Sequence, residues 1–422
     1  MSYPTPIVIS NLSTALADNS YDALVVVAEN FNQGLPEQFQ DLINKQAEFD
    51  TRIGSELVSI VSDELPQNRL ILAPTGSLNR YFDDVRRYFD AAHKAANVVV
   101  NMGAKKPLLV VLKNDNKAFE HAEIVSYLGF CQALWQPLEA REALGEAIEP
   151  ISMMGLVASA IDSSDMVAIE AGKYIARDLC GTEPERMSPT KFAEYCQETF
   201  ENSNVNVSVI DDMNELEQDF PLLWSVARAS VEVERHQPRV IRLEYIPKGD
   251  IEKTLMFVGK GIVYDTGGVD LKVGGHMAGM SRDKGGAAAV AGFMKTISEI
   301  APQGIKVVAE IAAVRNSIGA EAFVPDEIIT GHSGVRVRIG NTDAEGRLVM
   351  ADLLSRLREE ALDEVNPMLF TVATLTGHAA RAFGPYTAMV ENGVSWQSQN
   401  GRNMEAQGDI FADPCETSRS RR

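Results

Sequence analysis

Short apolar runs alternate with helical patterns through the first part of the chain. Between the apolar runs at residues 70–73 and 108–112, apolar residues recur from Val85 to Ala96 at the three- and four-residue spacing of an amphipathic helix. Strand–helix–strand order indicates a parallel sheet. Four uninterrupted runs rich in Val, Leu and Ile predict strands buried on both faces, at residues 23–28, 57–61, 70–73 and 108–112.

A polar, Glu-rich stretch at residues 139–150 precedes a helical pattern that runs to about Cys180. We place the domain boundary here, with residues 1–165 as a smaller N-terminal α/β domain and 166–422 as a larger catalytic one. Nothing catalytic stands out in the first domain, so we expect it to serve as a scaffold or to make oligomer contacts.

The second half repeats the α/β alternation. Ser188 and Pro189 are typical of a helix start, Ser as N-cap and Pro at the first helical position. The fold class we predict is therefore α/β in both domains. Strands are expected at 240–246, 255–259, 307–314 and 368–374, and helices at 286–300 and 346–360.

Composition and charge narrow the function classes. The 422 residues are 45% hydrophobic and 23% charged, which is ordinary globular usage. The net charge of −20 would repel phosphate backbones and anionic lipid, so we expect no nucleic-acid or membrane partner. No apolar run reaches the roughly 18 residues of a membrane span. The four cysteines show no CxxC pairing, which favours a reducing, cytoplasmic location.

Two segments concentrate unusual residues, Val258–Ala289 and Gly340–Leu354. Each begins where an apolar strand ends and finishes by starting a helix, which is where α/β folds place active sites. Four carboxylates are crowded among glycines there, and two divalent cations would balance their charge. Zn²⁺, Mn²⁺ and Mg²⁺ all suit such an oxygen-rich site. The four carboxylates are those of Asp265, Asp283, Asp343 and Glu345.

Three basic residues lie in the same segments. A lysine beside two cations is driven towards its neutral form and can then ligate a metal, whereas one further out stays charged and can stabilise an oxyanion. Lys260 and Lys272 are the candidates for these two roles. Arg347 comes at the start of a helix, where the dipole already favours an anion.

These residues resemble the leucyl aminopeptidase (cytosol aminopeptidase, peptidase M17) family. The matching stretches are GKGIVYDTGG, KVGGHMAGMSRDKGGA and above all NTDAEGRL, and the resemblance extends from about Ala176 to the end. It implies two domains, the larger one with a mixed, mainly parallel sheet flanked by helices. It also implies removal of N-terminal residues from peptides, often leucine, usually by a homohexamer.

The resemblance also implies a role for each site residue. Asp265 and Glu345 would bridge the two ions, and Lys272 would polarise the scissile carbonyl. Arg347 would hold a bicarbonate-like anion that acts as general base. The metal ligands would be Lys260, Asp265, Asp283, Asp343 and Glu345, and the substrate pocket would include Lys272, Met280, Thr374 and Gly377.

The mechanism that follows is a hypothesis. One ion binds the free α-amine of the peptide, an activated water attacks the carbonyl, and the metals with Lys272 stabilise the oxyanion. A non-catalytic homologue that acts as a structural or binding subunit is the alternative, and a dinuclear hydrolase of another amide is a third. No GxxxxGK[ST] or GxGxxG pattern supports a nucleotide site.

Two departures from the family pattern stand out. Lys284 follows Asp283 where relatives commonly have an apolar residue. Adjacent residues at a helix start diverge by about 100°, so we expect its side chain to point away from the metals. The last residues, Phe411–Arg422, resemble the middle of a family stretch, so we expect the sequence to be truncated at its C-terminal end.

Overall fold

The computed structural model describes residues 4–65, 67–145, 151, 153–158 and 163–420. It divides into two compact units. The first contains residues 1–136, 144–166 and 376–422, and the second contains 137–143 and 167–375. This division differs from the sequence-based one chiefly in residues 376–422, which belong to the first unit.

Aromatic contacts explain why the C-terminal segment joins the first unit. The Arg86 guanidinium lies over the Tyr386 ring, 5.0 Å from its centroid, and donates a hydrogen bond to the Tyr386 hydroxyl at 3.1 Å. The His121 and Phe411 rings stack with centroids 4.6 Å apart. These pairs join residues 300 and 290 positions apart, so no local sequence pattern predicts them.

A six-stranded sheet forms the centre of the first unit, in the order β1-β6-β5-β2-β4-β3. All neighbouring pairs are parallel except β3 with β4. The four predicted strands are all present, and β2 is buried along its whole length because it lies inside the sheet. The strands are β1 (Pro6–Ile9), β2 (Ala23–Ala28), β3 (Val58–Val61), β4 (Arg69–Pro74), β5 (Pro107–Leu112) and β6 (Met154–Val157).

Two details of this sheet differ from the prediction. Strand β3 alternates buried and exposed residues, with Val61 73% exposed, because an edge strand here is covered on one face only. Strand β6 lies where the helical pattern towards Cys180 was expected, and helix α6 (Ser163–Gly181) begins only after it. The short apolar run of β6 is too brief for its period to identify it.

The helices of the first unit include the predicted amphipathic one, α3 (Arg86–Asn101), which buries Tyr88, Ala92 and Ala96. The segment 376–422 adds a parallel strand pair, β14 with β15. The remaining elements are α1 (Leu12–Ala17), α2 (Glu37–Ala47), α4 (Ala122–Leu134), α12 (Gly377–Phe383), β14 (Thr387–Glu391), α13 (Gly393–Gln397), α14 (Asn400–Ile410) and β15 (Cys415–Arg419).

The second unit is built on a mixed five-stranded sheet in the order β13-β9-β10-β8-β7. Strands β13, β9 and β10 are parallel neighbours, and β8 runs antiparallel to both β10 and β7. The α/β class and the mixed, mainly parallel sheet are thus confirmed. The strands are β7 (Val205–Ile210), β8 (Arg239–Tyr245), β9 (Lys253–Asp265), β10 (Ile305–Asn316) and β13 (Pro367–Val372).

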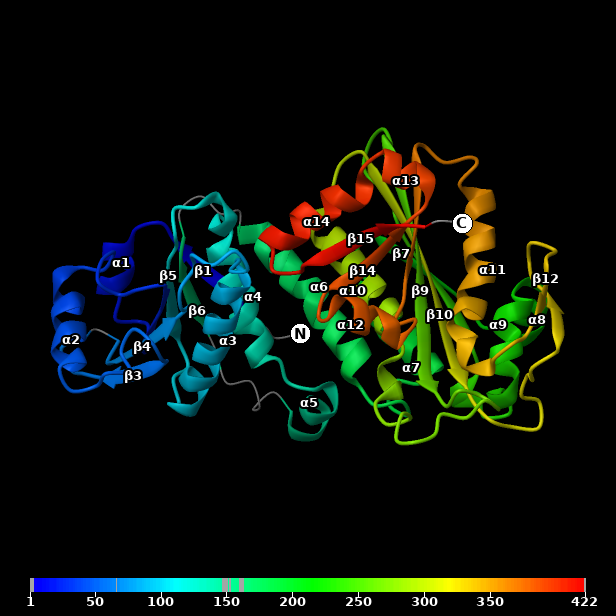
Figure 1. The fold of residues 1–422 in the computed structure, drawn as a ribbon, viewed down its shortest axis with the longest axis horizontal. Helices are drawn as coiled ribbons and strands as arrows, with labels where there is room; N and C mark the ends of the chain where they lie inside the picture. Colours follow the sequence, from blue (N-terminus) through cyan, green and yellow to red (C-terminus); the bar gives the residue numbers. More distant parts are fainter. Residues whose placement is uncertain (1–3, 66, 146–150, 152, 159–162, 421–422) are drawn as a thin grey trace. The chain divides into compact units, whose positions relative to one another are not determined.

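Helices cover both faces of this sheet (Figure 1). On one face α7 (Pro189–Phe200) and α10 (Gly285–Ile300) pack with the end of α6. On the other face lie α9 (Pro221–Ala227) and α11 (Glu345–Glu360), with α8 (Met213–Asp219) beside α9. The shorter elements are α5 (Leu138–Leu144), η5 (Met280–Arg282), β11 (Ile328–Thr330), β12 (Arg336–Arg338) and η6 (Thr342–Ala344).

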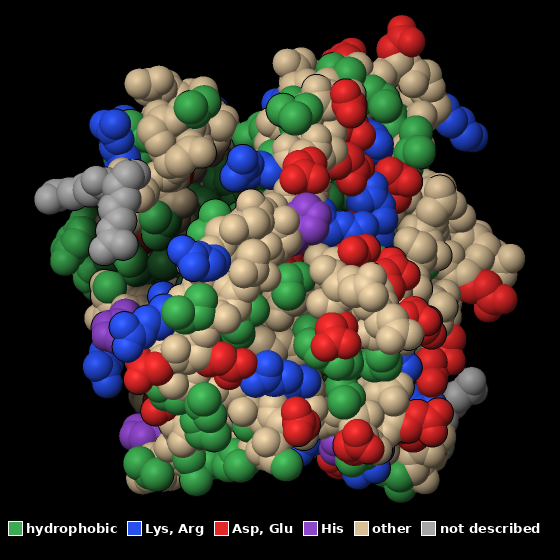
Figure 2. All heavy atoms as spheres, turned by 90° about the vertical axis from the view of Figure 1, so that its right-hand side faces the viewer, with side chains coloured by type: hydrophobic (Ala, Val, Ile, Leu, Met, Phe, Trp, Pro, Cys, Tyr) green, Lys and Arg blue, Asp and Glu red, His purple; other side chains and the backbone are tan. Residues whose placement is uncertain are grey.

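The surface shows how the acidic charge is distributed. Figure 2 shows one face, on which acidic and basic side chains are interspersed with hydrophobic and neutral polar ones. Within the described ranges, no helix combines the length and the apolar character that crossing a membrane requires.

Candidate metal centre

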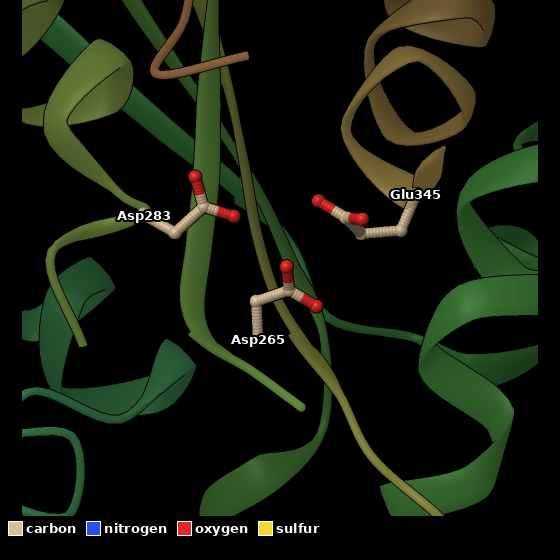
Figure 3. Close-up of side chains that lie close together, drawn as sticks. All are labelled: Asp265, Asp283 and Glu345. Carbon is tan, nitrogen blue, oxygen red and sulfur yellow. The ribbon is translucent and has the colours of Figure 1, made fainter. Parts of the chain in front are cut away.

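Three carboxylates meet beside the carboxyl end of strand β9. Asp265 is the last residue of β9, Asp283 lies between η5 and α10, and Glu345 is the first residue of α11. One oxygen from each lies within 4.8 Å of the others, and all three side chains are buried. Figure 3 shows their carboxyl groups pointing towards a common space. Segments that are far apart in the sequence therefore converge on one point. Strand β9 continues to Asp265 instead of ending near Gly259, so Lys260 lies within the strand and not in the loop that the sequence analysis expected.

Lys260, Asp283 and Glu345 form what we term the inner cluster. The Lys260 Nζ atom lies 2.8 Å from Asp283 Oδ2 and 2.9 Å from Glu345 Oε1, and its side chain is only 3% exposed. Thr374, just beyond β13, donates its hydroxyl to Asp283 Oδ1 at 2.8 Å. Its carbonyl oxygen accepts from Lys260 Nζ at 3.3 Å. A buried ammonium thus lies between two buried carboxyl groups and offsets the charge of one of them.

Gly346 makes room for that ammonium. A Cβ atom at position 346 would lie 2.5 Å from Lys260 Cε. The glycine of the NTDAEGRL motif therefore provides the space that the lysine side chain fills.

Burial dominates the protonation of the inner cluster. It raises the pKa of Asp283 to about 7, against the opposing attraction of Lys260. Burial by itself would lower the pKa of Lys260, but Glu345 and Asp283 together reverse this effect and raise it. Lys260 is therefore a charged ammonium when the carboxylates alone surround it.

Lys272, Asp265 and Asp343 form the outer cluster. The Lys272 Nζ atom lies 2.9 Å from Asp265 Oδ2 and also contacts Asp343 Oδ1. The Asp343 side chain is one-third exposed. Burial opposes the charge of Lys272, but hydrogen bonds to Asp343 and Asp265 outweigh it and raise the pKa of the lysine. Burial likewise raises the pKa of Asp343, against the hydrogen bond from Lys272.

The remaining predicted residues have different places. Arg347 is exposed in the first turn of α11, and Met280 is half-buried in η5. The described interactions do not join either side chain to the two clusters. Gly377 is the first residue of α12 and belongs to the first unit. Thr374, in contrast, contacts both Lys260 and Asp283 directly.

Two buried residues beside the clusters escaped the sequence analysis. Asn316, at the end of β10, donates to Asp265 Oδ1 at 2.8 Å, and the Gly267 N–H donates to the same oxygen at 2.9 Å. Thr342 donates its hydroxyl to Gly267 O at 2.7 Å and thereby holds the loop after β9. A polar residue directly after an apolar strand was the available signal for Asn316, since β9 and β10 end side by side.

Lys284 points away from the carboxylates, in agreement with the expectation for adjacent residues. Its ammonium donates to Thr182 O at 2.9 Å and to Ser281 O, and the side chain is completely buried. Burial lowers its pKa to about 8.

The donor set fits divalent cations. Carboxylate oxygens suit Zn²⁺, Mn²⁺ and Mg²⁺, and a neutral lysine amine adds a nitrogen ligand. Asp283 Oδ2 is buried, and its charged partner is the Lys260 ammonium at 2.8 Å. A divalent ion held by the same carboxylates would take over the role of this positive charge.

Sequence comparison identifies the family. The model of the cytosol aminopeptidase family catalytic domain matches residues 174–415, more than half of the chain. The "Putative aminopeptidase W07G4.4" of Caenorhabditis elegans is 43% identical over 423 residues, which cover 96% of this chain and 80% of that protein. This chain belongs to the cytosol aminopeptidase family. The motif-based resemblance is thereby confirmed.

Solved structures support the fold of the family. The apo leucyl aminopeptidase of Trypanosoma cruzi aligns with a TM-score of 0.81 at 22% identity, over 98% of this chain and 82% of that one. The bottromycin maturation enzyme BotP, solved in complex with Mn, aligns with a TM-score of 0.76 at 21% identity. That alignment covers 94% of this chain and 82% of the BotP chain.

Proposed function

We propose that this chain is a metal-dependent aminopeptidase that releases N-terminal residues, leucine-like ones preferentially, from peptides. The observation that carries the proposal is the convergence of Asp265, Asp283 and Glu345 within 4.8 Å, flanked by two lysines. Membership of the cytosol aminopeptidase family supports the reaction, and the Mn complex of BotP supports the type of ion.

The proposed ligands of two divalent ions are Lys260, Asp265, Asp283, Asp343 and Glu345. When bound, such ions supply Lewis acidity and lower the pKa of water for attack on the carbonyl. Metal binding requires a change in the protonation of Lys260. The metal-free site keeps this lysine charged, so its Nζ must lose a proton before the amine can bind a metal ion. Metal loading should therefore release protons.

Lys272 is proposed to stabilise the negative charge that develops on the scissile carbonyl. Asp265 and Asp343 orient its ammonium and keep it protonated, and its side chain is 14% exposed. A charged donor held in place before the reaction is the arrangement that favours an oxyanion. Substrate can thus approach this lysine, whereas Lys260 is almost fully enclosed.

The other roles rest on the family resemblance. We propose that Arg347, exposed in the first turn of α11, holds a bicarbonate-like anion that relays the proton to the leaving amine. Met280 and Thr374, both in the second unit, are proposed to line the pocket for the N-terminal side chain. A homohexamer in the cytoplasm is the proposed assembly and location, and the lack of a disulfide among the four cysteines, all within the described residues, suits that compartment.

The first test is hydrolysis of a leucine amide chromogenic substrate by the purified chain. The protein is treated with a chelator and then assayed with and without Mn²⁺ or Zn²⁺. We expect no turnover after chelation and restored turnover with metal. A matched panel of glycine, glutamate and lysine amides reports the preference for the N-terminal residue.

The matched variants are Glu345→Gln and Glu359→Gln, both on helix α11. Glu345 is buried in the site, whereas Glu359 is exposed near the other end of the helix. Glu345→Gln should abolish metal-restored turnover and Glu359→Gln should leave it unchanged. Metal binding without hydrolysis of any amide would instead favour a non-catalytic member of the family.

A further inference from the structure

The loop that carries Asp283 has few internal anchors. Residues 277–282 are exposed or only half-buried, and the three residues of η5 include none that is buried. Short backbone hydrogen bonds shape the turn, from Asp283 N to Met280 O at 3.2 Å and from Met280 N to Met277 O at 3.1 Å. These bonds fix the form of the loop. Two weak contacts join it to its surroundings: the Tyr264 hydroxyl donates to Met277 O at 3.3 Å, and the Cys180 thiol lies 3.9 Å from Arg282 O.

Lys284 adds a charged, fully buried tie at the end of the loop. Its buried ammonium donates to Ser281 O inside the loop and to Thr182 O at 2.9 Å, directly after the end of helix α6. Thr182 is itself buried and bonded back to the helix through its hydroxyl, which donates to Asp178 O at 2.6 Å. One side chain thus joins the loop to a fixed helix end.

The position of the Lys284 ammonium, at the C-terminal end of helix α6, suits a buried cation. Carbonyl groups at a helix C-terminus carry partial negative charge and favour an ammonium. The acidic side chains of Glu183 and Glu139 add attraction from outside. A methionine here would leave both carbonyl oxygens without this donor, and buried acceptors without a partner are unfavourable.

We propose that Lys284 is a positioning residue that holds the backbone of residues 281–283, and through it the Asp283 carboxylate, in place for metal binding. The proposal deepens the function proposed above and rests on it for the identity of the ligand. Lys284 does not touch the metal or the substrate. It acts through Asp283, whose carboxylate pairs with Lys260 and lies close to that of Glu345 (Figure 3 shows the two carboxylates).

The test compares Lys284→Met with two controls on helix α10. Lys295→Met removes a lysine that pairs with Glu299 at 2.5 Å, away from the loop. Val290→Ala removes buried core volume and lowers stability without altering the loop. Lys295→Met makes the same lysine-to-methionine change at a different position. Val290→Ala reproduces any loss of thermal stability that Lys284→Met causes.

Two readouts are measured on the full chain, well below its melting temperature. In the metal-free protein, we expect hydrogen–deuterium exchange of residues 277–284 to be at least about fivefold faster in Lys284→Met than in the controls. In a calorimetric titration with Mn²⁺, we expect its affinity to fall about 10- to 100-fold, the usual effect of losing an outer partner of a ligand. The controls should retain the wild-type affinity.

The outcomes separate this inference from the function on which it rests. If wild-type protein binds no Mn²⁺, the proposed function fails, and the exchange rates alone decide the role of Lys284. Unchanged exchange and unchanged affinity in Lys284→Met would overturn the inference.

If Lys284→Met does not fold, Lys284→Gln replaces it, with a smaller loss of affinity expected because the amide keeps a donor. Failure of both variants to fold while Val290→Ala folds would make Lys284 a residue of the folding core, and this too would overturn the inference.

Discussion

The inner and outer clusters have the same composition, one lysine between two carboxylates, but they differ in enclosure. Lys260 projects from the interior of strand β9, and its two partners are at most 8% exposed. Lys272 comes from a loop, and Asp343 is one-third exposed. Charges that cannot reach water must be balanced within the protein, whereas charges at the surface are also stabilised by solvent. The same residue types are therefore enclosed in one cluster and partly exposed to solvent in the other.

The largest effect should come from Lys260→Met. Both inner carboxylates would lose the ammonium that lies within 3 Å of them. Breaking a buried ion pair costs about 3–5 kcal/mol, so the free energy of unfolding should fall by that amount and metal-restored turnover should disappear. Urea unfolding of the metal-free protein measures the first and the leucine amide assay measures the second. Wild-type stability in this variant would contradict the contrast between the clusters.

Lys272→Met tests the outer cluster with the same substitution. Asp265 keeps the hydrogen bonds from Asn316 and Gly267 to its Oδ1 but loses the Lys272 ammonium at its buried Oδ2, whereas Asp343 can be hydrated. Stability should therefore fall by about 1–3 kcal/mol, less than in Lys260→Met. The kcat should fall about 10²- to 10³-fold, as expected when an oxyanion donor is removed. The comparison fails if Lys272→Met is as destabilising as Lys260→Met.

Gly346→Ala sharpens the contrast without removing a charge. The new methyl group would meet Lys260 Cε, and overpacking of a buried site costs about 1–3 kcal/mol. We expect lower stability together with weaker Mn²⁺ binding, because the lysine must move. Gly275→Ala is the comparison for added volume, since a Cβ there meets no atom within 4 Å, although its φ of +84° adds backbone strain. Unchanged Mn²⁺ binding in Gly346→Ala would contradict the proposed packing.

The smallest effect concerns acid sensitivity outside both clusters. Hydrogen bonding from Arg235, with help from His236 and Arg315, lowers the pKa of Glu185 to about 2 from an ordinary value of 4.5. A depressed carboxyl pKa stabilises the folded state above the unfolded value, and this contribution is lost as the pH falls through about 2. The melting temperature of Glu185→Gln should therefore lie below that of the wild type at pH 7, and the difference should shrink towards pH 2. A difference independent of pH would rule out the ion pairs as its source.

Much of the fold could be predicted because buried parallel strands leave a local signature. The runs at 23–28, 240–246 and 307–314 correspond to strands within one or two residues. The period-based argument failed at β6, a four-residue strand too short to be distinguished from a helix, and it left β7 without a prediction. Edge position, which decides that β3 exposes Val61, depends on neighbours that the local sequence does not specify.

The sequence by itself determined the chemical inventory of the site: four carboxylates, two lysines and the glycines around them, in motifs specific enough to identify the family. Only the tertiary structure decided which lysine pairs with which carboxylates, that Asn316 supports Asp265, and that Lys284 anchors its loop to the end of α6. Residue types and short spacings are local properties of a chain. Enclosure and charge pairing instead depend on segments that meet only when strands β9, β10 and β13 lie side by side. This arrangement sets which ammonium is enclosed and which is partly exposed.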